Sequence, residues 1–320
     1  MTSLPYFDAD EIRSALPYTT AIAAITAGLR SGVDPECDSP RLFSAAPGGE
    51  FLLMPAQGSE FSGVKALTVA PQNPARNLAK IQGVYILYSS DTLAPVAVLE
   101  GASLTAIRTP AVTLTAVSHL AAAAPGLTPQ APLVLVYGAG VQAAGHIRAA
   151  RAVFPAARFA VIGRSPERVT ALCAEFPKLD IADYGAMPET AVSAADIILC
   201  TTSACAPLFD GSLVRETAIV AAVGTHGRDL REVDDVLVRR SDVVVEGRAS
   251  AARENGNLAT ALTEADWAAP TAPRNLRELV SGEVTRRTGR PALYTGVGMS
   301  WEDLICAAAV FSAAEQSTRR

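Results

Sequence analysis

Residues 133–143 of this chain read Leu-Val-Leu-Val-Tyr-Gly-Ala-Gly-Val-Gln-Ala. Five apolar residues lead directly into a Gly-x-Gly-x-x-Ala turn, and a helix pattern follows. A buried strand, a glycine turn and a helix, in this order, form the context in which such a turn binds a dinucleotide. Gly138 permits the tight turn, Gly140 lets the backbone approach a pyrophosphate, and the small Ala143 lets the helix lie close to the strand. The N–H groups at the start of the helix, beside Val141 and Gln142, then hold the phosphates.

The rest of the C-terminal half repeats this alternation of strand and helix. Further apolar strand patterns, separated by helix patterns, lie at residues 159–162, 196–201, 218–223 and 242–245. Strands that alternate with helices form a parallel sheet with helices on both faces. The sequence therefore predicts an α/β Rossmann dinucleotide-binding domain. A glycine turn that only joins a strand to a helix is the alternative, and the flanking elements favour the cofactor site.

The N-terminal part has a different order of predicted helices and strands. A helix pattern covers residues 8–29, and five strand patterns follow with no helix between them, at residues 41–44, 50–54, 63–69, 83–88 and 95–99. Short strands joined by Pro, Gly and Asn turns favour a mostly antiparallel sheet. A helix pattern over residues 103–124 then leads to a Pro/Gly-containing linker at residues 124–132, the best domain boundary in the chain. An Ala-rich helix pattern at residues 301–315 follows near the end.

Composition excludes several classes of partner. The 320 residues are 49% hydrophobic and 18% charged, with a net charge of −5 and no stripe of Lys and Arg, so we expect a globular protein that binds no nucleic acid. The start lacks a signal-peptide pattern, and no apolar run approaches 18 residues, so no membrane span is expected.

Five scattered cysteines favour reduced, buried thiols and a cytoplasmic location. Three dispersed histidines form no metal-binding pattern, and no metal is expected.

The end of the second Rossmann strand indicates which dinucleotide binds. An NAD site carries an Asp or Glu there, which bonds the ribose 2′-hydroxyl. Here the segment places Arg164, Ser165 and Arg168 in that region, and Arg suits a 2′-phosphate because its fork makes bidentate contacts. We therefore expect NADPH to be preferred and NADH to be possible; a helix start with solvated arginines is the alternative. Three further cofactor contacts are predicted at the ends of later strands, at Thr201, Val223 and Gly224.

Four motifs occur in order along the chain: Gly63-Val-Lys65, Ser103-Leu-Thr-Ala-Ile-Arg108-Thr109-Pro-Ala111, Gly138-Ala-Gly140-Val-Gln142 and Val297-Gly-Met-Ser-Trp-Glu302-Asp303-Leu. Together they resemble the ornithine cyclodeaminase/mu-crystallin family over nearly the whole chain. The resemblance implies a substrate-binding and dimerisation α+β domain, residues 1–117 with 295–320, and an NAD(P)-binding domain, residues 118–294. It implies a homodimer. It also places Arg41, Lys65 and Arg108 around a substrate carboxylate and Thr109 against the cofactor.

The three cations support this interpretation on chemical grounds. A domain poor in charge carries Arg41 beside a strand, Lys65 inside an apolar strand and Arg108 in an apolar helix. Buried cations need a partner, and a substrate carboxylate would supply one. Ordinary ion pairs with Glu50, Glu100 or Asp91 are the alternative.

One segment departs from the ornithine cyclodeaminases that the chain resembles. Those enzymes carry an aspartate two residues after the glycine that ends the fifth Rossmann strand, where this chain has His226. Histidine can be cationic or neutral near pH 7, so it is no simple replacement for a permanent anion. Cyclisation of ornithine is therefore disfavoured, although Asp229 is a carboxylate nearby that could take part of that role.

These observations predict an NAD(P)H-dependent oxidoreductase. It would reduce the C=N bond of a cyclic imino acid, of the Δ1-pyrroline-2-carboxylate or ketimine reductase type, to an L-amino acid. Lys65, or His226 through water, would supply the proton that the nitrogen needs. Ornithine cyclodeaminase and alanine dehydrogenase are the alternatives within the family, and a crystallin-like protein that binds NADPH without turnover is the alternative from another class.

Overall fold

The computed structural model describes residues 4–124, 126 and 128–318. The chain forms two compact units, which we call unit 1 (Met1–Arg108 and Met299–Arg320) and unit 2 (Thr109–Gly298). The boundary falls inside the long helix α3 (Gly101–Ala122), just before Pro110, which cannot donate a backbone hydrogen bond within the helix. The functional division that we predicted, residues 1–117 with 295–320 and residues 118–294, stays a prediction.

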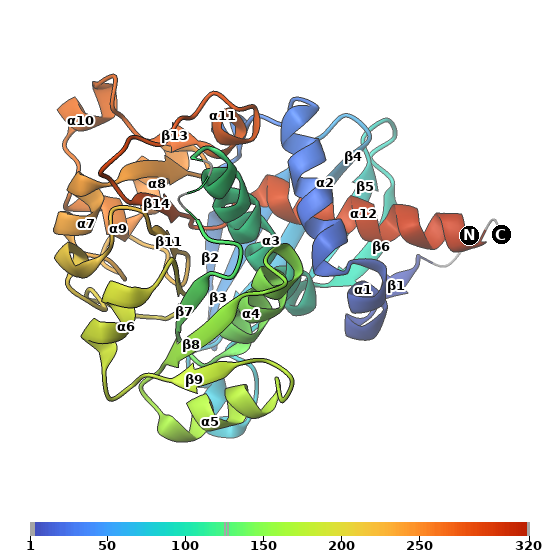
Figure 1. Cartoon of the computed structure of the whole chain (residues 1–320). Coiled ribbons are helices and arrows are strands. Elements are labelled where there is room, and N and C mark those ends of the chain that lie inside the picture. Colours follow the sequence, from blue (N-terminus) through green and yellow to red (C-terminus); the bar gives the residue numbers. More distant parts are fainter. Residues whose placement is uncertain (1–3, 125, 127, 319–320) are drawn as a thin grey trace. The chain divides into compact units, whose positions relative to one another are not determined.

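Unit 1 is built on one sheet of six strands in the order β1-β6-β5-β4-β3-β2 (Figure 1). The short β1 runs parallel to β6 and the other pairs are antiparallel, as the sequence predicts. The strands are β1 (Tyr6–Phe7), β2 (Leu42–Ala46), β3 (Gly49–Ala56), β4 (Phe61–Val69), β5 (Ile81–Ser89) and β6 (Pro95–Glu100).

The helices of unit 1 correct one prediction. The single helix expected over residues 8–29 is two helices, α1 (Ala9–Ala15) and α2 (Tyr18–Arg30), because Pro17 interrupts the backbone hydrogen bonds. The C-terminal helix α12 (Ser300–Thr318) packs on α2, where Gly28 leaves room for Ile305: a Cβ at Gly28 would lie 2.5 Å from Ile305 Cδ1. Short 3-10 turns are η1 (Pro35–Cys37) and η2 (Asn73–Arg76).

Unit 2 is built on a parallel sheet of eight strands in the order β13-β12-β14-β11-β10-β7-β8-β9. Its strands are β7 (Leu133–Tyr137), β8 (Arg158–Ile162), β9 (Ile181–Asp183), β10 (Ile197–Cys200), β11 (Ile219–Ala222), β12 (Asp242–Val245), β13 (Arg274–Asn275) and β14 (Ala292–Thr295). The Rossmann prediction is confirmed, although β9, β13 and β14 were missed. They have two to four residues, too few to display a strand period.

The strand order of unit 2 fixes where a ligand can bind. From β7 the chain moves to β8 and β9 on one side, and then returns to β10 and β11 on the other. Ligands of open parallel sheets bind at such a reversal, beyond the carboxyl ends of the strands. The helices of this unit after α3 are α4 (Val141–Val153), α5 (Pro166–Ala174), α6 (Pro188–Ala194), η3 (Gly211–Leu213), α7 (Asp235–Arg240), α8 (Arg248–Glu254), α9 (Gly256–Ala259), α10 (Glu264–Ala268) and α11 (Leu276–Val280).

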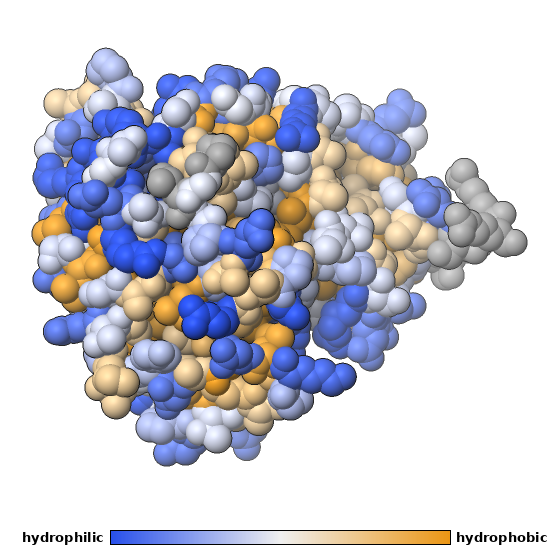
Figure 2. Space-filling view, viewed as in Figure 1, coloured by the Kyte–Doolittle hydropathy of each residue, from blue (hydrophilic) through white to orange (hydrophobic). Residues whose placement is uncertain are grey.

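The surface matches the composition. Hydrophilic side chains cover much of the face in Figure 2, with apolar residues visible between them. None of the described helices is long and apolar enough to cross a membrane. Cys200 and Cys306 are buried, but Cys37 and Cys205 are exposed, so the prediction that the thiols are buried is wrong for these two.

Candidate functional site

The carboxyl edge of the sheet in unit 2 carries a cavity of about 870 Å³. The segments that follow β7, β8 and β10 line it, together with Gly224 after β11. It therefore lies at the reversal of strand order described above. Most of the predicted cofactor residues line this cavity: Gly138, Gly140, Val141, Gln142, Arg164, Ser165, Arg168, Thr201 and Gly224. Thr109 and Val223 are not among its lining residues, and their role stays a prediction.

The glycine turn fits a bound pyrophosphate. Gly138 has φ +117°, and a Cβ there would lie 2.7 Å from Thr201 Oγ1, so only glycine fits. Gly140 precedes α4 in an extended conformation, and no side chain caps the helix. A Cβ at Gly140 would meet no atom within 4 Å, so open space lies against the first N–H groups of α4. An uncapped helix start beside open space is a site for an anionic group.

The end of β8 carries two arginines and a helix cap. Ser165 accepts a hydrogen bond from the Arg168 N–H (3.3 Å), and its hydroxyl donates to Glu167 Oε2 (2.7 Å). This hydroxyl contact is the main reason that the pKa of Glu167 is lowered. Ser165 therefore caps α5, as the alternative interpretation of this segment expects. Arg164 and Arg168 both line the cavity.

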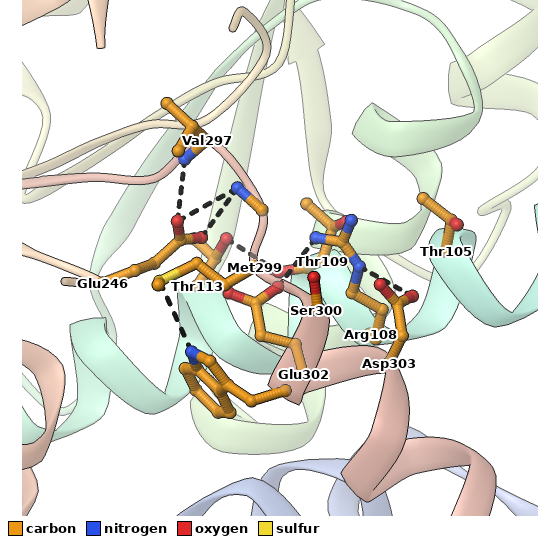
Figure 3. Close-up of polar contacts among 12 residues, drawn as sticks. Thr105, Arg108, Thr109, Thr113, Glu246, Val297, Met299, Ser300, Glu302 and Asp303 are labelled. Carbon is orange, nitrogen blue, oxygen red and sulfur yellow. Dashed lines mark hydrogen bonds and ion pairs between the residues drawn. The ribbon is translucent and has the colours of Figure 1, made fainter. Parts of the chain in front are cut away.

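In unit 1, two of the predicted substrate cations form one buried cluster with two carboxylates. Lys65 on β4 is 1% exposed, and its Nζ donates to Asp303 Oδ2 at 2.6 Å. Arg108 on α3 is 6% exposed; Nη1 donates to Glu302 Oε2 (2.8 Å) and Nε to Asp303 Oδ1 (3.3 Å) (Figure 3). Asp303 thus bridges both cations.

Both cations have ion-pair partners within the protein, as the alternative interpretation holds, but the partners are other carboxylates than the three named there. Glu302 and Asp303 in the first turn of α12 take the place of Glu50, Glu100 and Asp91. Glu100 instead accepts hydrogen bonds from Ala102 and Ser103 at the start of α3. Adjacent acidic residues in the first turn of a helix usually lie in solvent beside the helix dipole. The sequence held one indication that Glu302 and Asp303 are buried. The helix after them is almost entirely apolar, so its first turn is expected to be buried as well.

The electrostatic environment places Lys65 near its point of titration. Burial lowers the pKa of Lys65 to about 8, Asp303 opposes this effect, and the charges of Arg108 and Arg41 lower the pKa further. Arg41 therefore acts on the same ammonium group, although its own side chain is only partly buried. An ammonium has three N–H donors, and among the described residues Nζ has one hydrogen-bond acceptor. The remaining donors of this buried cation suit an oxygen-rich ligand.

A tyrosine that sequence reasoning missed lies beside Lys65. Tyr85 on β5 is paired with Lys65 in the sheet and is 0% exposed. Its hydroxyl lies over Gly63, where a Cβ would come within 2.2 Å of it, which explains the glycine two residues before the lysine. Burial and the charge of Asp303 raise the pKa of this hydroxyl, so it stays protonated. The sequence signal was weak, since Tyr85 occupies an ordinary inward position of a strand.

His226 and Asp229 follow β11 in unit 2, and both side chains are exposed. Neither lines the cavity described above. Their predicted catalytic roles therefore stay predictions. Within the described part of the chain, no group of three or more His, Cys, Asp and Glu is arranged to hold a metal ion.

A comparison against known families agrees with the four sequence motifs around Lys65, Arg108, Gly138 and Glu302. The family model of the ornithine cyclodeaminase/mu-crystallin family matches residues 8–318. The chain belongs to this family. Its relatives include the Delta(1)-pyrroline-2-carboxylate/Delta(1)-piperideine-2-carboxylate reductase of Azospirillum brasilense, 31% identical over 95% of this chain and 94% of that protein. Delta(1)-pyrroline-2-carboxylate reductase 2 of Burkholderia ambifaria is 32% identical over the same shares.

Solved structures of other proteins have the same fold. The Delta(1)-pyrroline-2-carboxylate reductase of Thermococcus litoralis, in complex with NADH and L-proline, has a TM-score of 0.86 at 24% identity and covers 98% of both chains. A probable ornithine cyclodeaminase of Bordetella pertussis has a TM-score of 0.84 at 26% identity, again over 98% of both chains. Because proteins with different reactions share the fold, the side chains of the site must decide the activity.

Proposed function

We propose that this chain reduces the C=N bond of a cyclic imino acid bearing a 2-carboxylate, such as Δ1-pyrroline-2-carboxylate, to an L-amino acid. The observation that carries the proposal is the buried cluster of Lys65 and Arg108, in which Lys65 Nζ has N–H donors beyond the one that it gives to Asp303. Two relatives above 30% identity with reductase names support it. A nicotinamide cofactor, when bound, would supply the hydride.

The residues of unit 2 would bind the cofactor. The N–H groups at the start of α4 would hold the pyrophosphate, in the space that Gly140 leaves open. Gly138 would keep the backbone turn that aims these groups. We propose that Thr109 and Val223, which do not line the cavity, also contact the cofactor.

The cations of unit 1 would hold the substrate carboxylate. Arg108 is fixed by Glu302 and Asp303, so little side-chain entropy is lost when a ligand binds to it. Lys65 is fixed by Asp303 and keeps N–H donors for a second oxygen ligand. Together with Arg41 they would orient the C=N carbon for attack, and orientation is a major part of the rate in such a reaction.

Reduction of an imine also needs a proton on nitrogen. Lys65 would donate it from Nζ, because a pKa of about 8 leaves the group mostly protonated at neutral pH yet able to release a proton. His226, acting through a water molecule, is the other proton donor we proposed from the sequence, and Asp229 is the carboxylate proposed near it in the same segment.

The pH dependence of the reaction tests the role of Lys65. If protonated Lys65 is the donor, kcat/KM is constant below its pKa and falls as pH rises through about 8. We expect a fall of about tenfold per pH unit above that point. The measurement is the initial rate of NADPH oxidation between pH 6 and 10, with cofactor affinity titrated at each pH as the control.

The variant Asp303→Asn sharpens this test. Asp303 raises the pKa of Lys65, so its removal should move the fall in kcat/KM to lower pH. A profile that stays flat to pH 10, or one that Asp303→Asn does not move, would argue for another donor.

We propose that NADPH is preferred over NADH, because Arg164 and Arg168 follow β8 and line the cavity, and arginine suits a 2′-phosphate. Arg164→Asp should weaken NADPH binding by about tenfold to a hundredfold, the loss of one charge-assisted contact. NADH affinity should change by less than about threefold. Fluorescence titration with both cofactors measures this, and Arg151→Asp, an exposed change on α4, is the matched control. Equal losses for both cofactors would show that Arg164 does not meet the 2′-phosphate.

We also propose that the protein is a homodimer joined through the sheet of unit 1. Leu42 and Phe51 are 56% and 46% exposed, and their register places both on the face opposite the buried Leu52 and Met54. Phe51→Glu should shift the native mass towards the 33.2 kDa of one chain in light scattering, because it puts a charge into an apolar contact. Leu93→Glu, an exposed change in a turn of the same unit, should leave the mass unchanged. A native protein that is already a single chain would refute the dimer.

A substrate panel tests the proposed function. Purified protein should oxidise NADPH when given Δ1-pyrroline-2-carboxylate or its six-membered analogue. Turnover of pyruvate with ammonia, and none of the cyclic imines, would make it an amino-acid dehydrogenase. Release of ammonia and proline from ornithine with catalytic NAD would make it a cyclodeaminase in spite of His226. Cofactor binding without turnover on any of these would favour the crystallin-like binding protein.

A further inference from the structure

A buried carboxylate lies behind the wall of the cofactor cavity. Glu232 of unit 2 is 0% exposed. Its Oε1 accepts hydrogen bonds from the Thr202 N–H (2.7 Å) and the Thr202 hydroxyl (2.7 Å), and its Oε2 accepts one from the Gly224 N–H (2.8 Å). Among the described residues, no cation forms an ion pair with it. Backbone and hydroxyl dipoles alone stabilise its charge.

The residues that Glu232 holds belong to two different segments of the cavity wall. Thr202 follows β10 and Gly224 follows β11, and both line the cavity, whereas Glu232 does not. The two segments are in direct contact: a Cβ at Gly224 would lie 2.2 Å from the Thr202 nitrogen and oxygen. The carboxylate therefore sets how these two segments lie against each other.

The backbone of Glu232 is itself held in place by Asn257. Asn257 Oδ1 accepts hydrogen bonds from the N–H groups of Glu232 (2.7 Å) and Val233 (3.2 Å). Asn257 Nδ2 donates to Thr295 Oγ1 (3.1 Å), and that hydroxyl donates to the Ala222 carbonyl (2.9 Å). The network joins the carboxyl ends of β10, β11 and β14. Fully bonded buried networks of this kind hold one arrangement rigidly.

We propose that Glu232 is a positioning residue for the dinucleotide: it fixes the wall formed by the segments after β10 and β11 and does not touch the cofactor. This role rests on the proposed function, since it requires that the cavity of unit 2 binds a nicotinamide dinucleotide. The chemistry of the carboxylate explains the choice of residue. Its two oxygens only accept hydrogen bonds, and every group that meets them is a donor.

The variant Glu232→Gln tests the proposal with almost no change of shape. If the amide oxygen stays with Thr202, the NH2 group faces the Gly224 N–H, so that two donors meet and the contact is lost. We expect the Kd of NADPH and of NADH to rise by about tenfold, the effect of one hydrogen bond to a charged group. Both cofactors should be affected equally, because Glu232 does not contact Arg164 or Ser165. The measurement is fluorescence titration well below the unfolding temperature.

A matched control separates positioning from general destabilisation. Glu246 is a second buried carboxylate of unit 2, 4% exposed, which accepts hydrogen bonds from the Val297 and Gly298 N–H groups and does not line the cavity. Glu246→Gln also removes a buried charge and should leave both Kd values within about twofold of native. If Glu232→Gln lowers the unfolding temperature but binds both cofactors with native Kd, the residue is only structural and the proposal is overturned.

A smaller change keeps the proposal testable if Glu232→Gln does not fold. Thr202→Val removes the hydroxyl bond to Glu232 but keeps the N–H bond, and should raise both Kd values by about threefold. Thr202→Ser keeps the hydroxyl and should recover the affinity that Thr202→Val loses. Equal Kd values for Thr202→Val and Thr202→Ser would overturn the role of Glu232. A native protein that binds neither cofactor would overturn the proposed function itself, which is a different outcome.

Discussion

Lys65→Met should reduce the rate of imine reduction by about a hundredfold to ten-thousandfold, the usual contribution of a general acid. The substitution removes the proton donor and one of the cations proposed to hold the carboxylate. Cofactor affinity should not change, because the proposed cofactor residues of the cavity belong to unit 2. The measurements are kcat/KM with Δ1-pyrroline-2-carboxylate and the Kd of NADPH.

A second variant distinguishes loss of chemistry from loss of folding. Lys65→Met leaves Asp303 buried with Arg108 as its remaining cation, and breaking such a pair costs about 3–5 kcal/mol of unfolding free energy. After Lys65→Met the cluster holds two carboxylates and one cation, so adding Asp303→Asn removes the excess negative charge and should restore much of that stability, measured by denaturant unfolding. Activity should stay low in the double variant. If activity returned together with stability, Lys65 would be a structural cation and not the proton donor.

Gly140→Val should abolish cofactor binding without destabilising the protein. A Cβ at this position meets no atom of the protein, and the extended backbone accepts a β-branched residue, so the fold has room for the side chain. The new methyl groups would occupy the space proposed for the pyrophosphate. We expect the Kd of NADPH to rise by at least about a hundredfold, because the phosphates could no longer reach the N–H groups of α4.

Gly138→Val is the contrast to this prediction. Gly138 has φ +117°, and a Cβ there would collide with Thr201, so this change should lower the unfolding temperature as well as the affinity. Thermal unfolding of the free protein and a titration with NADPH separate the two cases. An unfolding temperature that falls equally in both variants would show that Gly140 serves the fold and not the ligand.

Local patterns made much of the fold predictable. The glycine turn at residues 138–143 and the evenly spaced strands after it were sufficient for a Rossmann sheet, because each strand–helix repeat is a local signal. β14 escaped prediction although it lies between β11 and β12, since four residues after a turn-rich segment have no period to read. Pro17 marks the break between α1 and α2 in the sequence. The helix pattern continues on both sides of this proline, so the sequence alone predicted a single helix.

The site was less predictable because its contacts are distant in sequence. Lys65 and Arg108 could be singled out as cations in apolar elements, and their partners could not, because Glu302 and Asp303 lie at the far end of the chain. Glu232 had no signal at all: it is an acidic residue in a polar segment, and only the packing of the loops after β10 and β11 gives it a role. Local periodicity predicts elements, whereas such networks depend on how the elements come together.

Transfer of an isotopic label tests the central claim most directly. NADPH that carries deuterium at the transferable position of C4 is mixed with Δ1-pyrroline-2-carboxylate and the purified protein, and the product is examined by mass spectrometry and chiral chromatography. The proposed reaction gives L-proline with one deuterium on its α-carbon. Unlabelled proline, or oxidation of NADPH without proline, would contradict hydride transfer to the C=N carbon.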